Sequence, residues 1–180
     1  MTSRLVRILP AVVMAIGIMF GPRGGVAEER TVRAMMVWQG EGTAVRIGES
    51  KAMLVAVIEG SMFIDGNKGV LHTASILCPI TAIIGHDLSQ TVRGRCSIVD
   101  IDGDRVYARF TCKGEHFKGC RGLFTLVGGS GKFKGIQGGG PVTFLSKMGD
   151  LRLDQIGIVR RRTIGLANFP ALKIRTVEKK

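Results

Sequence analysis

The sequence predicts an all-β domain, folded as a barrel or a sandwich. Short runs rich in Val, Ile and other strand-forming residues alternate with breaks that contain Gly, Asp or Asn, which is typical of such folds. No helical apolar stripe of similar strength follows residue 28. Of the 180 residues, 26 are Gly without a three-residue period and 45% are hydrophobic. This composition excludes a collagen-like or a disordered chain and indicates a globular core with many tight turns.

The first 27 residues have the pattern of a signal peptide. Arg4 and Arg7 precede an uncharged run over 8–20, which is shorter than the roughly 20 apolar residues that a membrane-spanning helix needs. Gly25 and Ala27 supply small residues at the −3 and −1 positions of a cut before Glu28. We therefore predict a periplasmic or secreted protein, with a permanent N-terminal anchor as the alternative.

The rest of the chain divides into three predicted parts. Residues 28–50 form an N-terminal extension or the first strands, 51–165 the β-barrel domain, and 166–180 a basic C-terminal tail. Loss of 1–27 would lower the net charge from +12 to +9. A basic exported protein can rest against an anionic envelope surface. Nucleic acid is not an expected partner, because a single Trp and a single Tyr offer few stacking residues. The oligomeric state stays open.

Four cysteines, an even number in an exported chain of this size, indicate two disulfides. Three pairings exist, and we favour Cys112–Cys120, which closes a short excursion between two strands, together with Cys78–Cys96. Zinc is the competing interpretation, and His116 lies between Cys112 and Cys120. The gaps of 18, 16 and 8 between successive cysteines lack the two- to four-residue spacing of most zinc sites, so we expect no metal.

The strand predictions depend on alternation of apolar and polar residues. In the run 105–112, Val106, Ala108, Phe110 and Cys112 fall on one face, which we expect in the core, because successive side chains of a strand point to opposite sides. The same parity puts Cys96 and Ile98 inward, opposite Arg93, Arg95 and Ser97. Residues 75–84 fit either a helix or a buried strand. The predicted strands are 31–38, 43–47, 52–64, 70–77, 91–100, 105–112, 122–127, 140–146 and 155–163.

An acidic turn joins two of these runs at Asp100, Asp102 and Asp104. The pair Asp102-Gly103 between alternating strands is a strong hairpin signal, because the tight turn needs a positive φ. An EF-hand is excluded, since glycine falls at the fourth position of the loop and Thr111 at the twelfth. A calcium site of another kind stays open beside the plain turn.

The densest glycine segment of the chain spans 128–140. Its Gly131-Lys132 pair lacks both the earlier glycine and the following Ser or Thr of a phosphate-binding loop, and the dinucleotide-binding pattern fails at Lys134. We therefore expect no nucleotide and no other cofactor. The segment is predicted to fold Phe133 and Ile136 back against the end of the domain. The residues of this structural glycine loop are Gly128, Gly129, Ser130, Gly131, Phe133 and Gly135.

These motifs resemble the allene oxide cyclase and dirigent-like β-barrel proteins, and their bacterial exported, uncharacterised relatives in particular. The shared order is a cysteine at Cys96, the acidic turn 100–104 and the glycine segment 128–136, and the resemblance covers about 50–165. It implies an antiparallel eight-stranded barrel of calycin-like shape. No catalytic residue of the plant enzymes can be matched to a position in this chain.

Few side chains are candidates for acid-base chemistry. Glu59 ends the apolar run 54–58 and shares parity with Val55 and Val57, so that if this face is inward the carboxyl group lies in an apolar barrel. The alternative is a strand bend with Glu59 in water. His72 and the pair His86-Asp87 are similarly ambiguous, and neighbours along a strand point apart and form no triad.

Three functions follow from this pattern. The favoured one is an exported barrel that binds a small hydrophobic ligand, since an eight-stranded barrel can enclose one small molecule. The second is a filled barrel that acts as a structural or envelope-interaction protein. The third is a cyclase- or isomerase-like enzyme that uses Glu59 in the same cavity. The presence or absence of a cavity separates the second from the other two.

Overall fold

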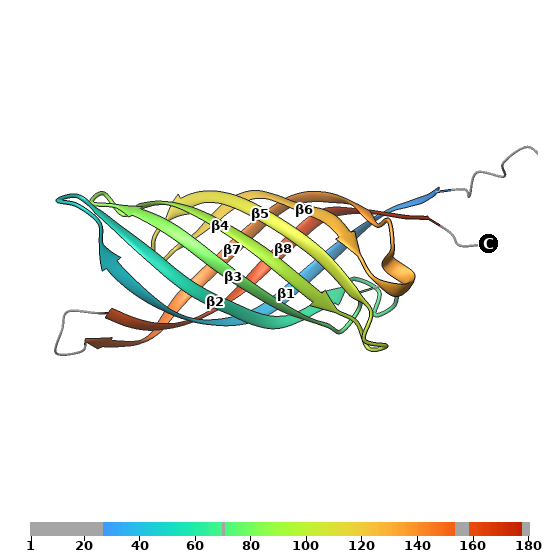
Figure 1. Cartoon of the computed structure of the whole chain (residues 1–180), viewed down its shortest axis with the longest axis horizontal. Coiled ribbons are helices and arrows are strands. Elements are labelled where there is room, and N and C mark those ends of the chain that lie inside the picture. Colours follow the sequence, from blue (N-terminus) through green and yellow to red (C-terminus); the bar gives the residue numbers. More distant parts are fainter. Residues whose placement is uncertain (1–26, 70, 154–158, 178–180) are drawn as a thin grey trace, which may run out of the picture.

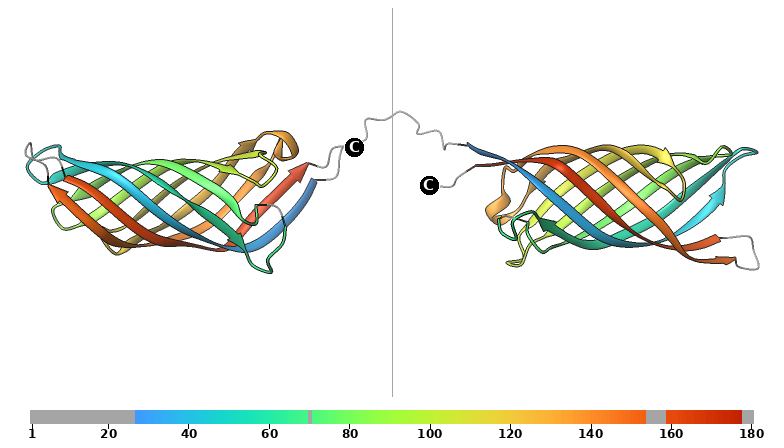
Figure 2. Two further views of the ribbon diagram at one scale, coloured as in Figure 1. Left: turned by 90° about the horizontal axis from the view of Figure 1, so that it is seen from below. Right: turned by 180° about the vertical axis from the view of Figure 1, so that it is seen from behind.

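Eight antiparallel strands close into a single barrel in which each strand pairs with its neighbours in the chain and β8 pairs with β1. The computed structural model describes residues 27–69, 71–153 and 159–177. Figures 1 and 2 show the tilted strands from three sides. The strands are β1 (Ala27–Arg46), β2 (Lys51–Ile64), β3 (Ala74–Gly85), β4 (Ser89–Val99), β5 (Arg105–Glu115), β6 (Gly119–Gly129), β7 (Gln137–Leu153) and β8 (Val159–Val177), with a 3-10 turn η1 (Gly131–Phe133) before β7.

The inner face of each strand is apolar, as the alternation predicts. In β5, Val106, Ala108, Phe110 and Cys112 are buried, and the residues between them are exposed. In β3 the same strict alternation extends from Ala74 to Ile84, so the segment that fitted either a helix or a strand is a strand with one buried face. The inner faces meet in one continuous core.

Phenylalanines fill the middle of the barrel. The ring centroids of Phe110 and Phe144 lie 4.7 Å apart, and those of Phe124 and Phe169 lie 5.1 Å apart in an edge-to-face arrangement. Such pairs are favoured because the positive edge of one ring meets the negative face of another. This layer separates the two ends of the barrel.

Several predicted boundaries are wrong. The runs 31–38 and 43–47 belong to one strand, β1, which continues through Gly40 and Gly42. The run 70–77 begins too early, because residues 71–73 form a turn and β3 starts at Ala74. Of the two alternatives for 28–50, the first strands are confirmed by β1, whereas the predicted end of the barrel at 165 is wrong because β8 continues to Val177. Most of the expected basic tail 166–180 is therefore barrel wall.

Residues 1–26 of the predicted signal peptide, residues 155–158 of the predicted strand 155–163 and the last three residues of the chain lie outside the described residues. Within the described ranges, no helix is long and apolar enough to cross a membrane.

Candidate functional site

A small cavity opens at one mouth of the barrel, at the end that carries the β3–β4 and β5–β6 turns. Its volume is about 90 Å³. The aromatic layer of Phe110 and Phe144 closes it from below, and aliphatic side chains of β2, β3 and β4 form its walls. The apolar lining consists of Trp38, Leu54, Ala56, Ile58, Ile80, Ala82, Val92, Phe110, Phe117 and Phe144.

A hydrogen-bonded pair of side chains, His116 and Gln90, stands at the rim of this cavity. The side-chain amide of Gln90 donates to the carbonyl oxygens of Glu115 and Gly119, at 3.3 and 3.2 Å. Its Oε1 therefore faces His116 Nδ1 at 3.1 Å and accepts the Nδ1 proton. The backbone N–H of His116 donates to Leu88 at 2.8 Å. These bonds fix a buried imidazole beside the apolar lining.

The only tryptophan of the chain, Trp38, lies in the barrel wall beside the cavity. Its two cross-strand neighbours are both glycines, Gly60 in β2 and Gly165 in β8. A Cβ atom on Gly165 would lie 2.5 Å from Trp38 Cζ2, so the indole takes the space that a side chain on β8 would fill. Trp38 is 7% exposed, and its indole N–H has no hydrogen-bond partner among the described residues. An unpaired buried donor is unusual and costs free energy.

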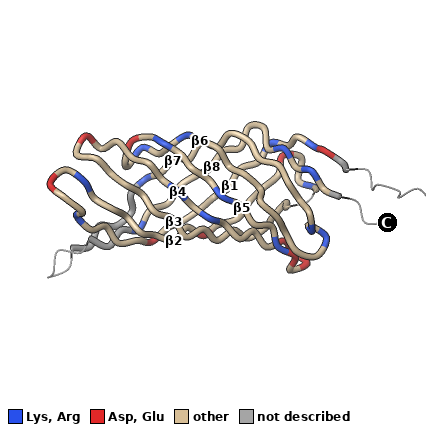
Figure 3. Tube along the Cα trace, turned by 45° about the horizontal axis from the view of Figure 1, so that its top comes forward, with Lys and Arg blue, Asp and Glu red and all other residues tan. Residues whose placement is uncertain are grey.

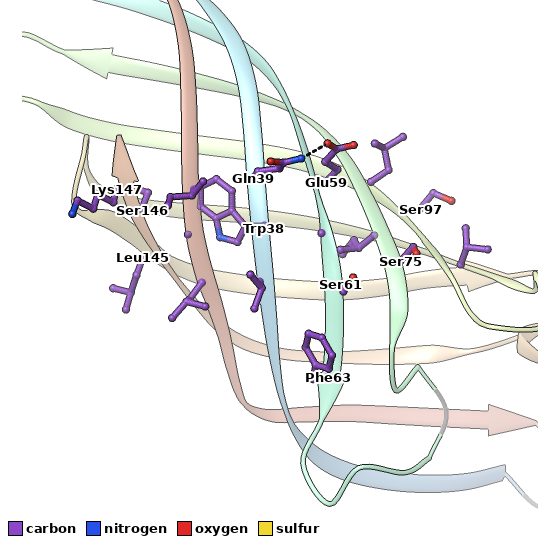
Figure 4. A pocket seen from close by; sticks show the side chains of 18 of the residues that line it. Trp38, Gln39, Glu59, Ser61, Phe63, Ser75, Ser97, Leu145, Ser146 and Lys147 are labelled. Carbon is purple, nitrogen blue, oxygen red and sulfur yellow. Dashed lines mark hydrogen bonds between the residues drawn. The ribbon is translucent and has the colours of Figure 1, made fainter. Parts of the chain in front are cut away.

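The outer surface of the barrel is hollowed on the other side of Trp38. Figure 4 shows this wide, open depression, which is bordered by residues of β1 to β5, β7 and β8. Glu59 lies here, exposed, and accepts a hydrogen bond from Gln39 Nε2 at 2.7 Å. Val55 and Val57 are also exposed, so the face that contains Glu59 is the outer face. The Glu59 carboxyl group therefore does not lie in the apolar interior of the barrel.

Both favoured disulfides, Cys78–Cys96 and Cys112–Cys120, are present in the structure. The four sulfur atoms are buried on the inner face, and Cys120 belongs to the lining of the cavity. Because Cys112 and Cys120 are bonded to each other, they cannot act as thiolate ligands beside His116. Within the described ranges, no three His, Cys, Asp or Glu side chains are grouped so as to hold a metal ion.

At the opposite end of the barrel, the acidic turn and the glycine segment meet. The carboxylate of Asp100 accepts the backbone N–H of Asp102 at 3.0 Å and of Asp104 at 2.9 Å, and Lys132 forms ion pairs with Asp100 and Asp102. The backbone N–H of Lys132 donates to Asp104 at 3.1 Å. We call these four residues the clasp. The structure thus gives the acidic turn a partner within the chain, the glycine segment.

The clasp places the glycine loop over the end of the barrel. Phe133 and Ile136 are each 1% exposed, as expected of side chains folded back against the domain. Gly131 has a φ of +54°, and a Cβ atom there would lie against the carboxylate of Asp104. Ser130 Oγ accepts the backbone N–H of Arg105 at 3.0 Å. The loop therefore has a structural role, and it closes this end with apolar side chains.

Charges in the clasp stabilise one another. Burial alone would raise the pKa of Asp100, but the hydrogen bond and the charge of Lys132, together with the backbone N–H groups of Asp104 and Asp102, lower it overall. The same bonds from Asp100 and Asp102 raise the pKa of Lys132. Lys132 is thus held as a cation in the clasp and is not a free charge of the surface.

Two of the other candidates, His72 and Asp87, have local structural roles. His72 Nδ1 accepts the backbone N–H of Ile64 at 3.1 Å, next to the β2–β3 loop. Asp87 accepts hydrogen bonds from the hydroxyl and the backbone N–H of Ser89, which lower the pKa of Asp87. Neither His72 nor His86 lines the cavity.

Sequence reasoning missed Trp38, Gln90 and His116 as a group. Trp38 and Gln90 are 52 positions apart, and only the barrel register brings them to one mouth. The solitary tryptophan between glycine-containing strands was the one available signal, because an inward aromatic opposite two glycines marks a place of close packing.

Comparisons with protein-family models, with curated proteins and with solved structures give no match for this chain. The resemblance to allene oxide cyclases and dirigent-like proteins therefore stays a prediction.

Proposed function

We propose that the protein binds a small, largely apolar molecule at the mouth of the barrel. The observation that carries this proposal is the apolar cavity itself, with the hydrogen-bonded pair His116 and Gln90 at its rim. His116 and Gln90 at the rim add polar contacts that orient a ligand, as in small-molecule sites generally.

The size of the cavity limits the ligand. A dry cavity of about 150 Å³ can hold benzene, so a cavity of about 90 Å³ admits a branched alkyl group or part of a small ring. The rest of the ligand would lie in the open mouth beside Phe117, which is 40% exposed.

We also propose that the protein is exported. The support is that all four cysteines are paired, which suits an oxidising compartment, and that the sequence of residues 1–27 has the signal-peptide pattern. Mass spectrometry of protein recovered from the cell envelope or medium should find a chain that starts at Glu28. An intact N-terminal segment would contradict export by cleavage.

Because Trp38 is the only tryptophan, intrinsic fluorescence reports directly on the site. We expect cyclohexanone to change the Trp38 emission in a saturable way, because its ring would pack beside the indole that lines the cavity. No saturable change would refute the proposal.

A pair of neighbouring substitutions separates binding in the cavity from binding elsewhere. Ala82→Leu fills the cavity from β3 and should abolish the response to cyclohexanone, whereas Thr81→Leu adds a similar side chain on the outer face and should not. Val92→Phe fills the same space from β4 and replaces Ala82→Leu if that variant is unstable. Binding that survives in a folded cavity-filled variant would place the ligand outside the barrel.

The runner-up is a filled barrel that acts through its outer surface. It is favoured by the exposed apolar side chains of β1, β7 and β8, among them Val37 at 48%, Leu145 at 55% and Ile164 at 52%. Native mass spectrometry of protein from its own envelope distinguishes the two, because a co-purified small molecule supports the cavity and a protein partner supports the surface. Glu59 gives no support to a cyclase- or isomerase-like activity, since it lies outside the cavity.

A further inference from the structure

Five basic side chains cover the outer face of β4, β5 and β6. We call this patch the basic face, and all of its members are exposed. Figure 3 shows basic positions along β4 and β5 in the middle of the barrel. The residues are Arg93, Arg95, Arg109, Lys113 and Arg121.

The register of the sheet sets like charges directly opposite one another in this face. Arg95 lies opposite Arg109 between β4 and β5, and Lys113 lies opposite Arg121 between β5 and β6. Like charges in directly opposed positions destabilise a sheet. Two such pairs on adjacent strands contribute nothing to holding the barrel together, so folding does not explain them.

None of the five basic side chains has an acidic partner among the described residues. Three other cations of the barrel wall are paired: Arg33 with Asp65 at 2.7 Å, Arg162 with Glu41 at 2.6 Å and Arg175 with Glu29 at 2.6 Å. The basic face, by contrast, gathers five cations without a counter-charge from the described residues. Its positive potential is left for a group outside the chain.

A depression of about 420 Å³ lies at the β3 side of the basic face, where β3, β4 and β5 run side by side. Arg93, Arg95 and Arg109 border it, together with the exposed residues Thr81 and Thr111. Guanidinium groups bind phosphate oxygens through paired N–H donors, and threonine hydroxyls can donate to the same oxygens. The depression has the donors that a phosphate group needs.

We propose that the basic face binds the phosphate headgroups of an anionic lipid surface. Adjacent strands are about 4.8 Å apart and the residues of one face about 6.7 Å apart along a strand, so the five cations cover roughly 10 by 13 Å of an open wall. That extent is comparable with the Debye length of about 8 Å, so the charges act on a surface together. An open, extended patch suits a surface of many phosphates better than one soluble anion.

Two exposed side chains within the face fit the same partner. Leu123, 66% exposed, follows Arg121 on the outer face of β6, and Tyr107, 44% exposed, precedes Arg109 on β5. Tyrosine rings favour the boundary between headgroups and acyl chains, because one end of the ring is apolar and the other polar. This inference does not depend on the barrel cavity, and neither does its test.

Flotation with lipid vesicles tests the proposal. The full chain should bind vesicles that contain phosphatidylglycerol and should not bind vesicles of phosphatidylcholine alone, and added salt should weaken the binding. Each basic residue near an anionic surface contributes about fivefold to binding, so Arg93→Gln, Arg95→Gln and Arg109→Gln together should lower it about a hundredfold. The control is Arg33→Gln, Arg162→Gln and Arg175→Gln together, which removes the same charge from paired positions and should lower binding by much less.

The outcomes separate the basic face from net charge and from soluble phosphate. Equal losses in the two triple variants would overturn the proposal, because binding would follow total charge alone. Binding of inorganic pyrophosphate, lost with Arg93, Arg95 and Arg109, without binding to vesicles would also overturn it. The triple variant of the basic face removes one like-charge pair and should melt no lower than the unmodified protein, so a loss of vesicle binding cannot be assigned to unfolding.

Discussion

Replacement of Asp100 by alanine should destabilise the barrel markedly, because this side chain holds the turn of the clasp. One carboxylate oxygen accepts two backbone N–H groups, at 3.0 and 2.9 Å, and only 5% of the side chain is exposed. Hydrogen bonds to a charged acceptor contribute about 1.5–3 kcal/mol each, and partial replacement by water at an exposed turn favours the lower limit. Asp100→Ala should therefore lower the free energy of unfolding by about 3 kcal/mol.

Urea denaturation, followed by Trp38 fluorescence with the disulfides intact, measures this loss as a lower midpoint at unchanged slope. Asp100→Asn keeps an acceptor oxygen and should lie between the wild type and Asp100→Ala. The control is Asp65→Ala, which removes an exposed ion pair with Arg33 and should cost within about 1 kcal/mol. If Asp100→Ala cost no more than Asp65→Ala, the assigned role of the clasp would be wrong.

The same carboxylate makes stability depend on pH. The folded state lowers the pKa of Asp100 below its ordinary value of 3.8. Its contribution is therefore complete above pH 3.8 and disappears as the pH falls through the lower pKa of the folded state. The stability difference between the wild type and Asp100→Ala should be constant from neutral pH to about pH 5 and should shrink in stronger acid. A difference that is unchanged in strong acid would contradict this linkage.

Three further perturbations test the packing. Gly165→Ala places a Cβ atom 2.5 Å from Trp38 Cζ2 and 2.2 Å from the carbonyl oxygen of Leu145. It should lower the free energy of unfolding by about 1–3 kcal/mol and shift the Trp38 emission, and an unshifted spectrum would contradict the packing. Phe133→Ala removes a side chain that is 1% exposed and should cost about 3–5 kcal/mol in urea denaturation, with the exposed Lys134→Ala as control. The disulfides Cys78–Cys96 and Cys112–Cys120 span 18 and 8 positions, so loop entropy predicts that changing each pair to alanine lowers the free energy of unfolding by about 3 and 2.5 kcal/mol, respectively. A larger loss for the shorter loop would contradict that account.

Local alternation and spacing made much of the fold predictable. The inward face of 105–112 was readable because its even positions are uniformly apolar or small. The favoured disulfides followed from spacing: Cys112–Cys120 closes a short excursion between two strands, and Cys78–Cys96 is then the other pair. The glycine segment was readable as a cap, because Phe133 and Ile136 are the apolar side chains in a run otherwise suited to tight turns.

The remaining features depend on contacts between distant segments. Gly40 and Gly42 looked like breaks, but a Cβ atom on Gly42 would lie 2.4 Å from the Cβ of Ala56, so glycine is required by the close approach of β2. Lys173 and Arg175 suggested a solvated tail, whereas Leu172 and Ile174 between and beside them are buried in β8. The residues that line the cavity could not be predicted, since they come from all eight strands and only the barrel register brings them together.

The pairing of β1 with β8 has a consequence for the order in which the barrel folds. The seam extends from Ala44 opposite Val159 to Ala27 opposite Val177, so its closest partners in sequence are 115 positions apart. In every other pair of adjacent strands, the two strands follow one another in the chain and form a hairpin. A hairpin forms readily because little chain must be ordered first. The seam should therefore close last. Until it does, β1 and β8 are open edges of a curled sheet whose apolar inner face is accessible, and this intermediate is the one most exposed to aggregation.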